Sequence, residues 1–401
     1  MGAYEVLRDR GFIQQCTDGV RELLDGDPTS FYVGFDPTAD CLHVGHLLPI
    51  MAMAHLQRAG HRPIAVIGGG TAMVGDPSGK DEARQLLTAE QIEKNKAAQK
   101  AILLRFLDFG ENGAVMVDNA EWLLGLNYID FLREIGRHFS MNTMLSKASV
   151  KLRLERGLSF LEFNYQVLQA YDFLELHKRY GCRLQLGGDD QWGNILAGID
   201  LIRRMEGGVA EGMTSPLLTT ASGQKMGKTV SGAVWIDSQR LSAYDYFQFW
   251  VNVDDADVGR LLRLFTFLEL SEVEALEALQ GADIRQAKER LALEATAIVH
   301  GQQEAEKARD GARAAFGGGG DQAEMPQHNS VFPVSLIQLL DESGLCSSRS
   351  DARRQIRGGA VRVGGEKVSD ENFELTQAQL DADGAVIVAR GKKKKLRVCQ
   401  A

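Results

Sequence analysis

The chain has 401 residues, 44% of them hydrophobic, which is enough for two or three domains with buried cores. No apolar stretch approaches the length that spans a bilayer, and residues 1–10 carry charges without an apolar signal core. We therefore expect a cytoplasmic protein without a membrane partner. The cysteines contain no C-x-x-C pair, which predicts reduced thiols; they are Cys16, Cys41, Cys182, Cys346 and Cys399.

The first informative segment joins a predicted strand to a predicted helix. An apolar run at 31–35 is followed by Asp36-Pro37-Thr38 and then by His43-Val44-Gly45-His46, the pattern of a strand, a turn and a helix start. Histidines three residues apart share one helix face, and Gly45 leaves room for a nucleotide beside the backbone. A lone H-x-G-H is more often a surface helix start, but this context favours the phosphate site of a doubly wound α/β fold.

Residues 1–240 continue the alternation of strands and helices. Further strands are predicted at 63–68, 114–117 and 183–187, and cap signals such as Thr88 with Gln91 mark the helix starts between them. This pattern predicts the fold class: a Rossmann-like, doubly wound parallel sheet covered by helices, forming the catalytic domain.

A helix predicted from Ser159 to His177 carries a polar stripe. Tyr165, Gln169 and Asp172 lie at i, i+4 and i+7 among apolar neighbours, so they share one buried face. A buried phenol, amide and carboxylate need polar partners, which either the protein or a ligand supplies.

The second informative segment is Lys225-Met226-Gly227-Lys228-Thr229. Gly227 and the preceding Ser222-Gly223 predict a loop that can close over phosphates, although a lone K-x-G-K is usually a solvated turn. Two histidines and two lysines together suit displacement of pyrophosphate at the α-phosphate of ATP, because that reaction needs positioned donors and cations more than a covalent nucleophile.

The rest of the chain is predicted to hold three parts. Residues 241–316 are rich in helix formers and form a helical domain, and the glycine-containing stretch 317–330 forms a flexible linker. Residues 331–401 form a small α+β domain. The net charge of −9 argues against an RNA partner, but this last part carries twelve Lys and Arg against nine Asp and Glu.

Four arginines recur on one side of a predicted helix in this C-terminal domain, which suits phosphate contact; they are Arg349, Arg353, Arg354 and Arg357. A solvated helix face is the alternative. The run 392–395 of four lysines is weaker, since such runs are as often disordered tails as RNA contacts.

Taken together, these segments resemble the bacterial tyrosyl-tRNA synthetases, which are class I enzymes. The resemblance rests on residues 31–46, Gly75-Asp76-Pro77-Ser78-Gly79-Lys80, the stretch 187–194 with Asp190-Gln191-Trp192-Gly193-Asn194, and residues 225–229. HVGH and KMGKT are variants of the signatures written HIGH and KMSKS. The match runs in order along essentially the full chain. It implies that the helical domain 241–316 lies on the anticodon side of the tRNA, and the part 331–401 is similar to an RNA-binding domain shared with a small-subunit ribosomal protein.

The resemblance implies roles for individual residues. For tyrosine, it implies contacts from Tyr32, Asp76, Tyr165, Gln169, Asp172 and Gln191, with Tyr32 and Asp172 at the phenol hydroxyl. For ATP, it implies contacts from Gly34, Asp36, His43, Gly45, His46, Asp190 and Lys228. For catalysis at the phosphates, it implies Thr38, His43, His46, Lys80, Arg84, Lys225, Lys228 and Thr229. Without the resemblance, the sequence alone favours Asp190 as a helix N-cap and Lys80 and Arg84 as surface charges.

The resemblance also implies the reaction: ATP is a substrate that brings Mg²⁺ on its phosphates, tyrosine is activated to an adenylate, and tyrosine then passes to tRNA(Tyr). A homodimer is expected and no protein-held metal. Val33 stands where some members of the family carry cysteine, and Pro49 where some carry threonine. We expect these two differences to tune the affinity for ATP. Two alternatives remain: a tryptophanyl-tRNA synthetase, which would lack the Tyr32 and Asp172 pair, and a synthetase-derived RNA-binding protein without catalysis.

Overall fold

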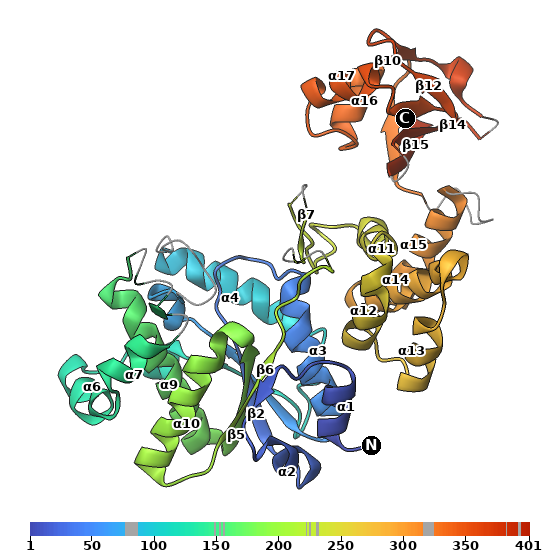
Figure 1. Ribbon diagram of the computed structural model, residues 1–401. Helices are drawn as coiled ribbons and strands as arrows, with labels where there is room; N and C mark the ends of the chain where they lie inside the picture. Colours follow the sequence, from blue (N-terminus) through green and yellow to red (C-terminus); the bar gives the residue numbers. More distant parts are fainter. Residues whose placement is uncertain are drawn as a thin grey trace. The chain divides into compact units, whose positions relative to one another are not determined.

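The computed structural model (Figure 1) describes the chain except for residues 77–86, 148–149, 152–153, 155–156, 222, 224–225, 230–231, 316–324, 382 and 392–393. For Lys228 and Thr229 it describes the backbone alone. The chain divides into two compact units, residues 1–241 with 253–291 and residues 242–252 with 292–401. The expected domain boundaries at 240, 316 and 330 remain predictions.

The first unit is built on a six-stranded sheet with the order β1-β6-β5-β2-β3-β4. All neighbouring pairs are parallel except β1 with β6, so the predicted parallel sheet is confirmed with one antiparallel edge strand added. The strands are β1 (Gln15–Cys16), β2 (Ser30–Phe35), β3 (Arg62–Ile67), β4 (Val115–Asp118), β5 (Cys182–Gly188) and β6 (Glu211–Ser215). A separate two-stranded ribbon joins β7 (Lys228–Thr229) to β8 (Gly232–Ala233).

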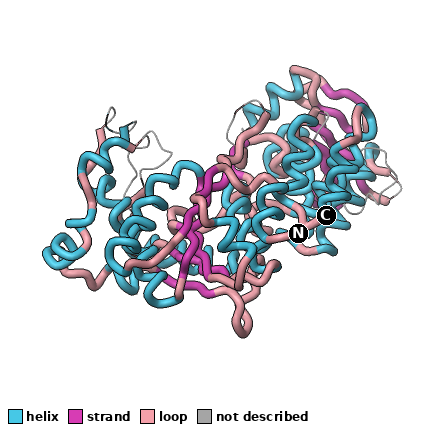
Figure 2. Tube along the Cα trace, turned by 60° about the horizontal axis from the view of Figure 1, so that its bottom comes forward, coloured by secondary structure: helices cyan, strands magenta, loops and turns pink. Residues whose placement is uncertain are grey.

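Helices cover both faces of this sheet, as the strands running between helices in Figures 1 and 2 show. They are α1 (Ala3–Asp9), α2 (Val20–Asp25), α3 (Val44–Arg58), α4 (Ala89–Leu103), α5 (Ala120–Leu123), α6 (Tyr128–Glu134), α7 (Met141–Ser146), α9 (Phe160–Tyr180) and α10 (Trp192–Glu206). Two of them begin at the predicted capping boxes, Thr88 with Gln91 and Ser159 with Glu162, which satisfy backbone N–H groups that a helix start leaves open. Tyr32 of β2, Ile64 of β3 and Phe173 of α9 belong to one apolar core between the helices and the sheet.

The order of the strands fixes where a ligand can bind. The chain runs outward from β2 to β3 and β4, and then returns to place β5 on the other side of β2. The topology therefore reverses between β2 and β5, and the crevice beyond the carboxyl ends of strands at such a point is the usual ligand site of open α/β sheets.

Five helices follow the sheet: α11 (Ala243–Val251), α12 (Val258–Phe265), α13 (Leu270–Glu277), α14 (Ile284–His300) and α15 (Gln302–Ala315). Within the first unit, α12 packs on α3, and the buried Arg10 of the N-terminal segment donates to the carbonyls of Arg263 and Thr266 beside it. Helices α11 and α15 pack on each other in the second unit.

The C-terminal part of the second unit has its own core. A five-stranded sheet has the order β12-β11-β14-β15-β9, with β15 and β9 parallel, and β10 pairs with β13 beside it. The elements are β9 (Gln327–Ser330), β10 (Val334–Ser335), α16 (Leu336–Glu342), α17 (Arg349–Arg357), β11 (Val361–Val363), β12 (Glu366–Val368), β13 (Glu374–Leu375), β14 (Ala385–Arg390) and β15 (Lys394–Gln400). Buried Leu339, Ile356 and Val388 join both helices to the sheet.

Among the described residues, no helix is long and apolar enough to cross a membrane. The five cysteines are free thiols, as the sequence predicted.

Candidate active site

The residues predicted to bind tyrosine and ATP meet at the carboxyl ends of β2 and β5. Tyr32, Gly34 and Asp36 alternate along β2 and its end, so they point to the same face of the sheet. Gly34 is exposed although its strand is central, and no atom lies within 4 Å of where its Cβ would be. The end of this strand therefore offers an open surface on the face that α9 covers further down.

The phenol end of the predicted tyrosine site is a buried carboxylate with two donors. Asp172 is 4% exposed, and its carboxylate accepts from Asn119 Nδ2 at 2.9 Å and from Trp122 Nε1 at 2.7 Å. Tyr32 is 2% exposed and packs edge-on against Phe173 with ring centroids 5.3 Å apart. The Tyr32 hydroxyl is buried without a hydrogen-bond partner among the described residues.

Burial controls the ionisation of both groups. Loss of solvent raises the pKa of Asp172 to about 7, although the hydrogen bonds from Asn119 and Trp122 act in the opposite direction. Burial also raises the pKa of Tyr32 well above its ordinary value, with the nearby Asp172 charge adding to the effect. The pair therefore presents a neutral phenol that can donate and a carboxylate that gains its charge near neutral pH.

Toward the phosphate side, the predicted polar residues form a network of two hydrogen-bonded branches. The Tyr165 hydroxyl donates to Asp36 Oδ2 at 2.8 Å, and burial raises its pKa well above the ordinary range. Asp36 Oδ1 accepts from Thr71 Oγ1, also at 2.8 Å. In the α9 stripe predicted from sequence, Tyr165 and Asp172 are buried and Gln169 is half-buried, and in this structure protein groups partner Tyr165.

A second branch of the network starts at the N-terminus of α10. Gln191 Nε2 donates to Asp76 Oδ2 at 2.8 Å, while Asn194 Nδ2 lies 2.9 Å from Gln169 Oε1 and 3.0 Å from Gln191 Oε1. Gln191 occupies the N-cap position of α10 and its side chain makes no cap bond, so the alternative of Asp190 as the cap of this helix is wrong.

The first signature lies at the start of α3, with a finer geometry than predicted. His43 is the N-cap rather than a helical residue; its Nδ1 accepts from the backbone N–H of Gly45 at 3.0 Å. His46 Nδ1 accepts from the backbone N–H of His43 at 3.3 Å, and the two rings lie 4.1 Å apart. A Cβ at Gly45 would lie 2.7 Å from His43 Cε1, which explains the glycine. With Nδ1 as acceptor, each neutral ring carries its proton on Nε2.

The second signature is brought against the first. Gly227 has a φ of 98°, a backbone conformation that favours glycine. A Cβ added at this position would lie 3.3 Å from the backbone nitrogen of Gly45. The Val234 backbone N–H donates to the Gly227 carbonyl at 2.9 Å, and the Val44 N–H donates to the Val234 carbonyl at 2.9 Å. Backbone hydrogen bonds through Val234 therefore connect the two signature segments, which are far apart in the sequence. Lys80, Arg84 and Lys225 lie outside the described residues, as do the side chains of Lys228 and Thr229.

Buried amides on α4 hold the turn that carries Thr38. Asn95 Nδ2 donates to the Pro37 carbonyl at 2.9 Å, and Gln99 Nε2 donates to the Ala39 carbonyl at 3.1 Å and the Asp36 carbonyl at 3.3 Å. Thr38 itself is exposed between these anchored carbonyls. The turn that presents Thr38 is therefore fixed from behind.

Four of these residues were missed by the sequence reasoning: Asn95, Gln99, Asn119 and Trp122. Asn119 lies two residues beyond the end of the predicted strand 114–117, and polar residues after a parallel strand point to the ligand edge of the sheet, so this signal was available. Among the described residues, no three His, Cys, Asp or Glu side chains form a group that could hold a metal ion.

The predicted RNA-binding arginines lie on α17 and are largely exposed. Arg354 pairs with Asp351 at 2.5 Å, Arg357 pairs with Glu371, and Arg349 lies 3.6 Å from Asp341. Within the lysine run, Lys394 and Lys395 belong to strand β15, so a disordered tail is wrong for these two.

Two signature segments side by side at the switch point of a parallel sheet define a class I aminoacyl-tRNA synthetase. Residues 24–317 match the family model of tRNA synthetases class I (W and Y), and residues 321–398 match that of the tyrosine–tRNA ligase SYY-like C-terminal domain. The chain belongs to this synthetase family, in its tyrosine–tRNA ligase branch, which confirms the resemblance seen in the sequence.

Individual relatives agree with this placement. A tyrosine–tRNA ligase of Clostridium botulinum is 53% identical over 98% of each chain, and one of Clostridium tetani is 50% identical over 98% of each. The crystal structure of a C-terminally truncated mitochondrial tyrosyl-tRNA synthetase of Aspergillus nidulans is 30% identical, with a TM-score of 0.71 over 79% of this chain and 94% of that one.

Proposed function

We propose that the chain catalyses tyrosine–tRNA ligation in two steps. The tyrosine carboxylate attacks the α-phosphorus of Mg-ATP, the bond to the bridging oxygen breaks, and tyrosyl-adenylate and pyrophosphate form. A ribose hydroxyl at the 3′ end of tRNA(Tyr) then attacks the activated carbonyl and releases AMP. The observation that carries this proposal is the buried Tyr32 and Asp172 pair at the switch point that also gathers both signatures.

The phenol end selects tyrosine by completing two hydrogen bonds. The substrate hydroxyl donates to Asp172, and its oxygen accepts from Tyr32, whose own hydroxyl is buried without a described partner. Phenylalanine would leave the buried Tyr32 hydroxyl without a partner and would take one donor away from Asp172, which costs more than the lost contact alone. Asn119 and Trp122 hold the carboxylate in place for this contact.

At the other end of the amino acid, we assign Tyr165, Gln169 and Asp76 to the α-ammonium group, for which their oxygens are acceptors. Gln191 lies on the carboxylate side and Asp190 at the ribose. Asn194 supports this assignment, because its amide bridges Gln169 and Gln191 and fixes how each presents its own amide.

At the phosphates, the proposed work is electrostatic. Since both Nδ1 atoms accept from backbone N–H groups, the neutral rings of His43 and His46 carry their donor hydrogens on Nε2, and we assign these donors to the nucleotide. His43 and Thr38 meet the departing phosphates, His46 lies near the ribose, and Gly34, Asp36 and Gly45 line the nucleotide. Lys80, Arg84, Lys225 and Lys228 neutralise the pyrophosphate, Thr229 donates to it through its hydroxyl, and the magnesium ion arrives on ATP as part of the substrate.

We further propose that the enzyme works as a cytoplasmic homodimer. Helix α6 has no buried residue. Large apolar side chains are exposed on and around it; they are Leu124, Tyr128, Ile129, Leu132 and Met141. An apolar patch of this kind usually marks an interface, and a second copy of the chain is the simplest closed arrangement. Sedimentation of the purified protein tests this part.

The function is tested by amino-acid-dependent exchange of pyrophosphate into ATP, run separately with each standard amino acid. We expect exchange with tyrosine and background rates with phenylalanine and tryptophan. Exchange driven by tryptophan would restore the sister specificity, and a complete lack of exchange with normal RNA binding would restore a binding protein without catalysis.

A further inference from the structure

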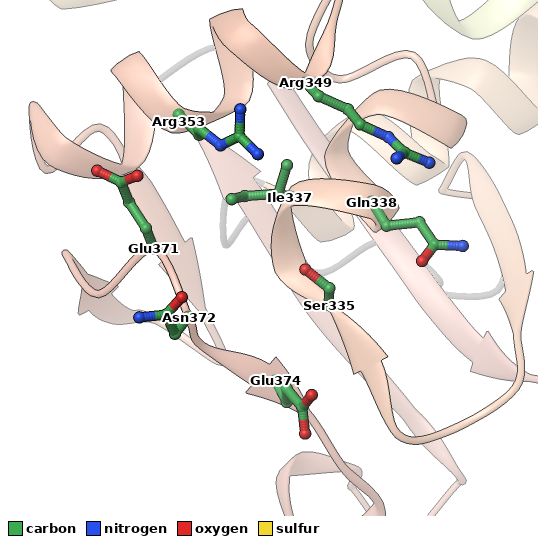
Figure 3. A pocket seen from close by; sticks show the side chains of 8 residues that line it. All are labelled: Ser335, Ile337, Gln338, Arg349, Arg353, Glu371, Asn372 and Glu374. Carbon is green, nitrogen blue, oxygen red and sulfur yellow. The ribbon is translucent and has the colours of Figure 1, made fainter.

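The C-terminal domain has a hollow of about 380 Å³ beside α17 (Figure 3). Its lining comes from three places: the beginning of α16, the outer face of α17, and the segment that leads into β13. The lining residues are Ser335, Ile337, Gln338, Arg349, Arg353, Glu371, Asn372 and Glu374. Figure 3 shows the two arginines on one side, Glu371, Asn372 and Glu374 on the other, and Ile337 between them.

The side chains of the hollow differ in how far they are already engaged. Glu371 is held by Arg357, whose Nη2 lies 3.1 Å from Glu371 Oε2, and Gln338 Nε2 donates to Glu342 at 2.8 Å. Arg353, Asn372 and Glu374, by contrast, make no side-chain hydrogen bond or ion pair with any residue in the described part of the chain. One cation, one amide and one carboxylate are therefore left to meet a ligand.

The charge pattern distinguishes between a phosphate and a base as that ligand. A surface that only follows the backbone of an RNA duplex neutralises phosphates, and a carboxylate inside it opposes binding. A base edge is different, because its amino and imino N–H groups donate to carboxylate and amide oxygens. Unstacked bases in RNA loops are read in this way, with an apolar or guanidinium surface against the ring.

We propose that this hollow binds one unpaired nucleotide of the tRNA, with Glu374 and Asn372 reading the base edge, Ile337 against the ring, and Arg353 on a neighbouring phosphate. A base with an exocyclic amino group fits the carboxylate, and guanine fits best, since its imino and amino N–H groups lie side by side and can both reach one carboxylate. This inference rests on the proposed role of the C-terminal domain in tRNA binding.

The test measures the affinity of full-length protein variants for a tRNA(Tyr) transcript by fluorescence anisotropy at several salt concentrations. For Glu374→Gln we expect binding about tenfold weaker with an unchanged salt slope, the size of one lost base contact. For Arg353→Ala we expect weaker binding and a slope reduced by about one. The control Glu366→Gln removes an exposed carboxylate on β12 outside the hollow and should bind as the parent does. Unchanged thermal denaturation confirms that each variant is folded.

The outcomes separate two kinds of failure. If Glu374→Gln binds equally well or more tightly while Arg353→Ala weakens binding, the hollow faces phosphates only and the base-reading proposal is overturned. If Arg353→Ala also leaves the affinity and its salt slope unchanged, the arginine face of this domain does not bind tRNA and that part of the proposed function fails with it.

Discussion

The phenol end of the catalytic site and the arginine face of the C-terminal domain use charge in opposite ways. Asp172 is 4% exposed and is held by two side-chain donors, whereas the side chains of Arg354 and Arg357 are 76% and 71% exposed and pair with carboxylates at the surface. Exposed pairs are screened and exchange partners at little cost, while a buried carboxylate is costly unless its partners are in place. The first arrangement suits discrimination between small molecules, and the second suits a large polyanion.

The largest effect is expected when the buried carboxylate is removed. Asp172→Ala takes away the acceptor for the tyrosine hydroxyl and should lower kcat/KM for tyrosine by about 4 kcal/mol, roughly a thousandfold. Steady-state exchange kinetics measure this. The matched control is Glu175→Ala on the same helix, whose carboxylate pairs with Arg179. Equal losses in the two variants would mean that damage to α9, and not loss of the acceptor, explains the effect.

The next effect separates the phosphate end from the phenol end. Lys228→Ala should slow adenylate formation by about 3 kcal/mol, roughly a hundredfold, because its cation engages the pyrophosphate chiefly in the transition state. The tyrosine dissociation constant should stay near the parent value. Rapid-quench measurement of adenylate with equilibrium dialysis of tyrosine tests both statements. A parallel loss in tyrosine binding would instead indicate a folding defect.

A smaller effect is expected from the second member of the phenol pair. Tyr32→Phe removes one donor to the substrate oxygen and keeps the ring that packs on Phe173. The preference for tyrosine over phenylalanine should fall by about 1.5 kcal/mol, roughly tenfold, with most of the tyrosine activity retained. If the variant discriminates as well as the parent, the hydroxyl is read elsewhere and the pocket assignment is wrong.

The smallest effect is a pH dependence. Burial raises the pKa of Asp172 to about 7, and the ionised form is the stronger acceptor, so tyrosine affinity should fall about fourfold between pH 8 and pH 6.5. Stability has the opposite sign: the native state keeps a proton that the unfolded chain has lost, so this contribution is full below about pH 4 and is lost as the pH rises through 7.

Titrating tyrosine binding in the parent and in Asp172→Asn checks the dependence. The variant should show a flat profile over this range. A parent profile that is itself flat would contradict the raised pKa.

The sequence predicted the sheet best in its longer apolar strands. The runs 31–35, 63–68, 114–117 and 183–187 match β2 to β5 to within one residue at each end, because strands of a sheet covered by helices are largely apolar. Strands β1 and β6 were not predicted, since Gln15–Cys16 is too short for a pattern and Glu211–Ser215 holds a glycine and polar residues.

In the candidate active site, the sequence predicted what depends on spacing within one helix. It predicted the stripe of Tyr165, Gln169 and Asp172, because a helix fixes which residues share a face. It could not predict that Asn119 and Trp122 hold Asp172, or that Gln99 holds the turn before Thr38, because these contacts join separate elements and depend on tertiary packing.

The measurement that tests the central comparison most directly is a salt titration of two affinities in the same full-length protein. Between 50 and 200 mM salt, the dissociation constant for tyrosine should change by less than about twofold, because buried contacts are screened little. Over the same range, four arginine contacts to phosphates predict a loss of tRNA affinity of about a hundredfold. A tRNA affinity as insensitive to salt as that for tyrosine would contradict the account.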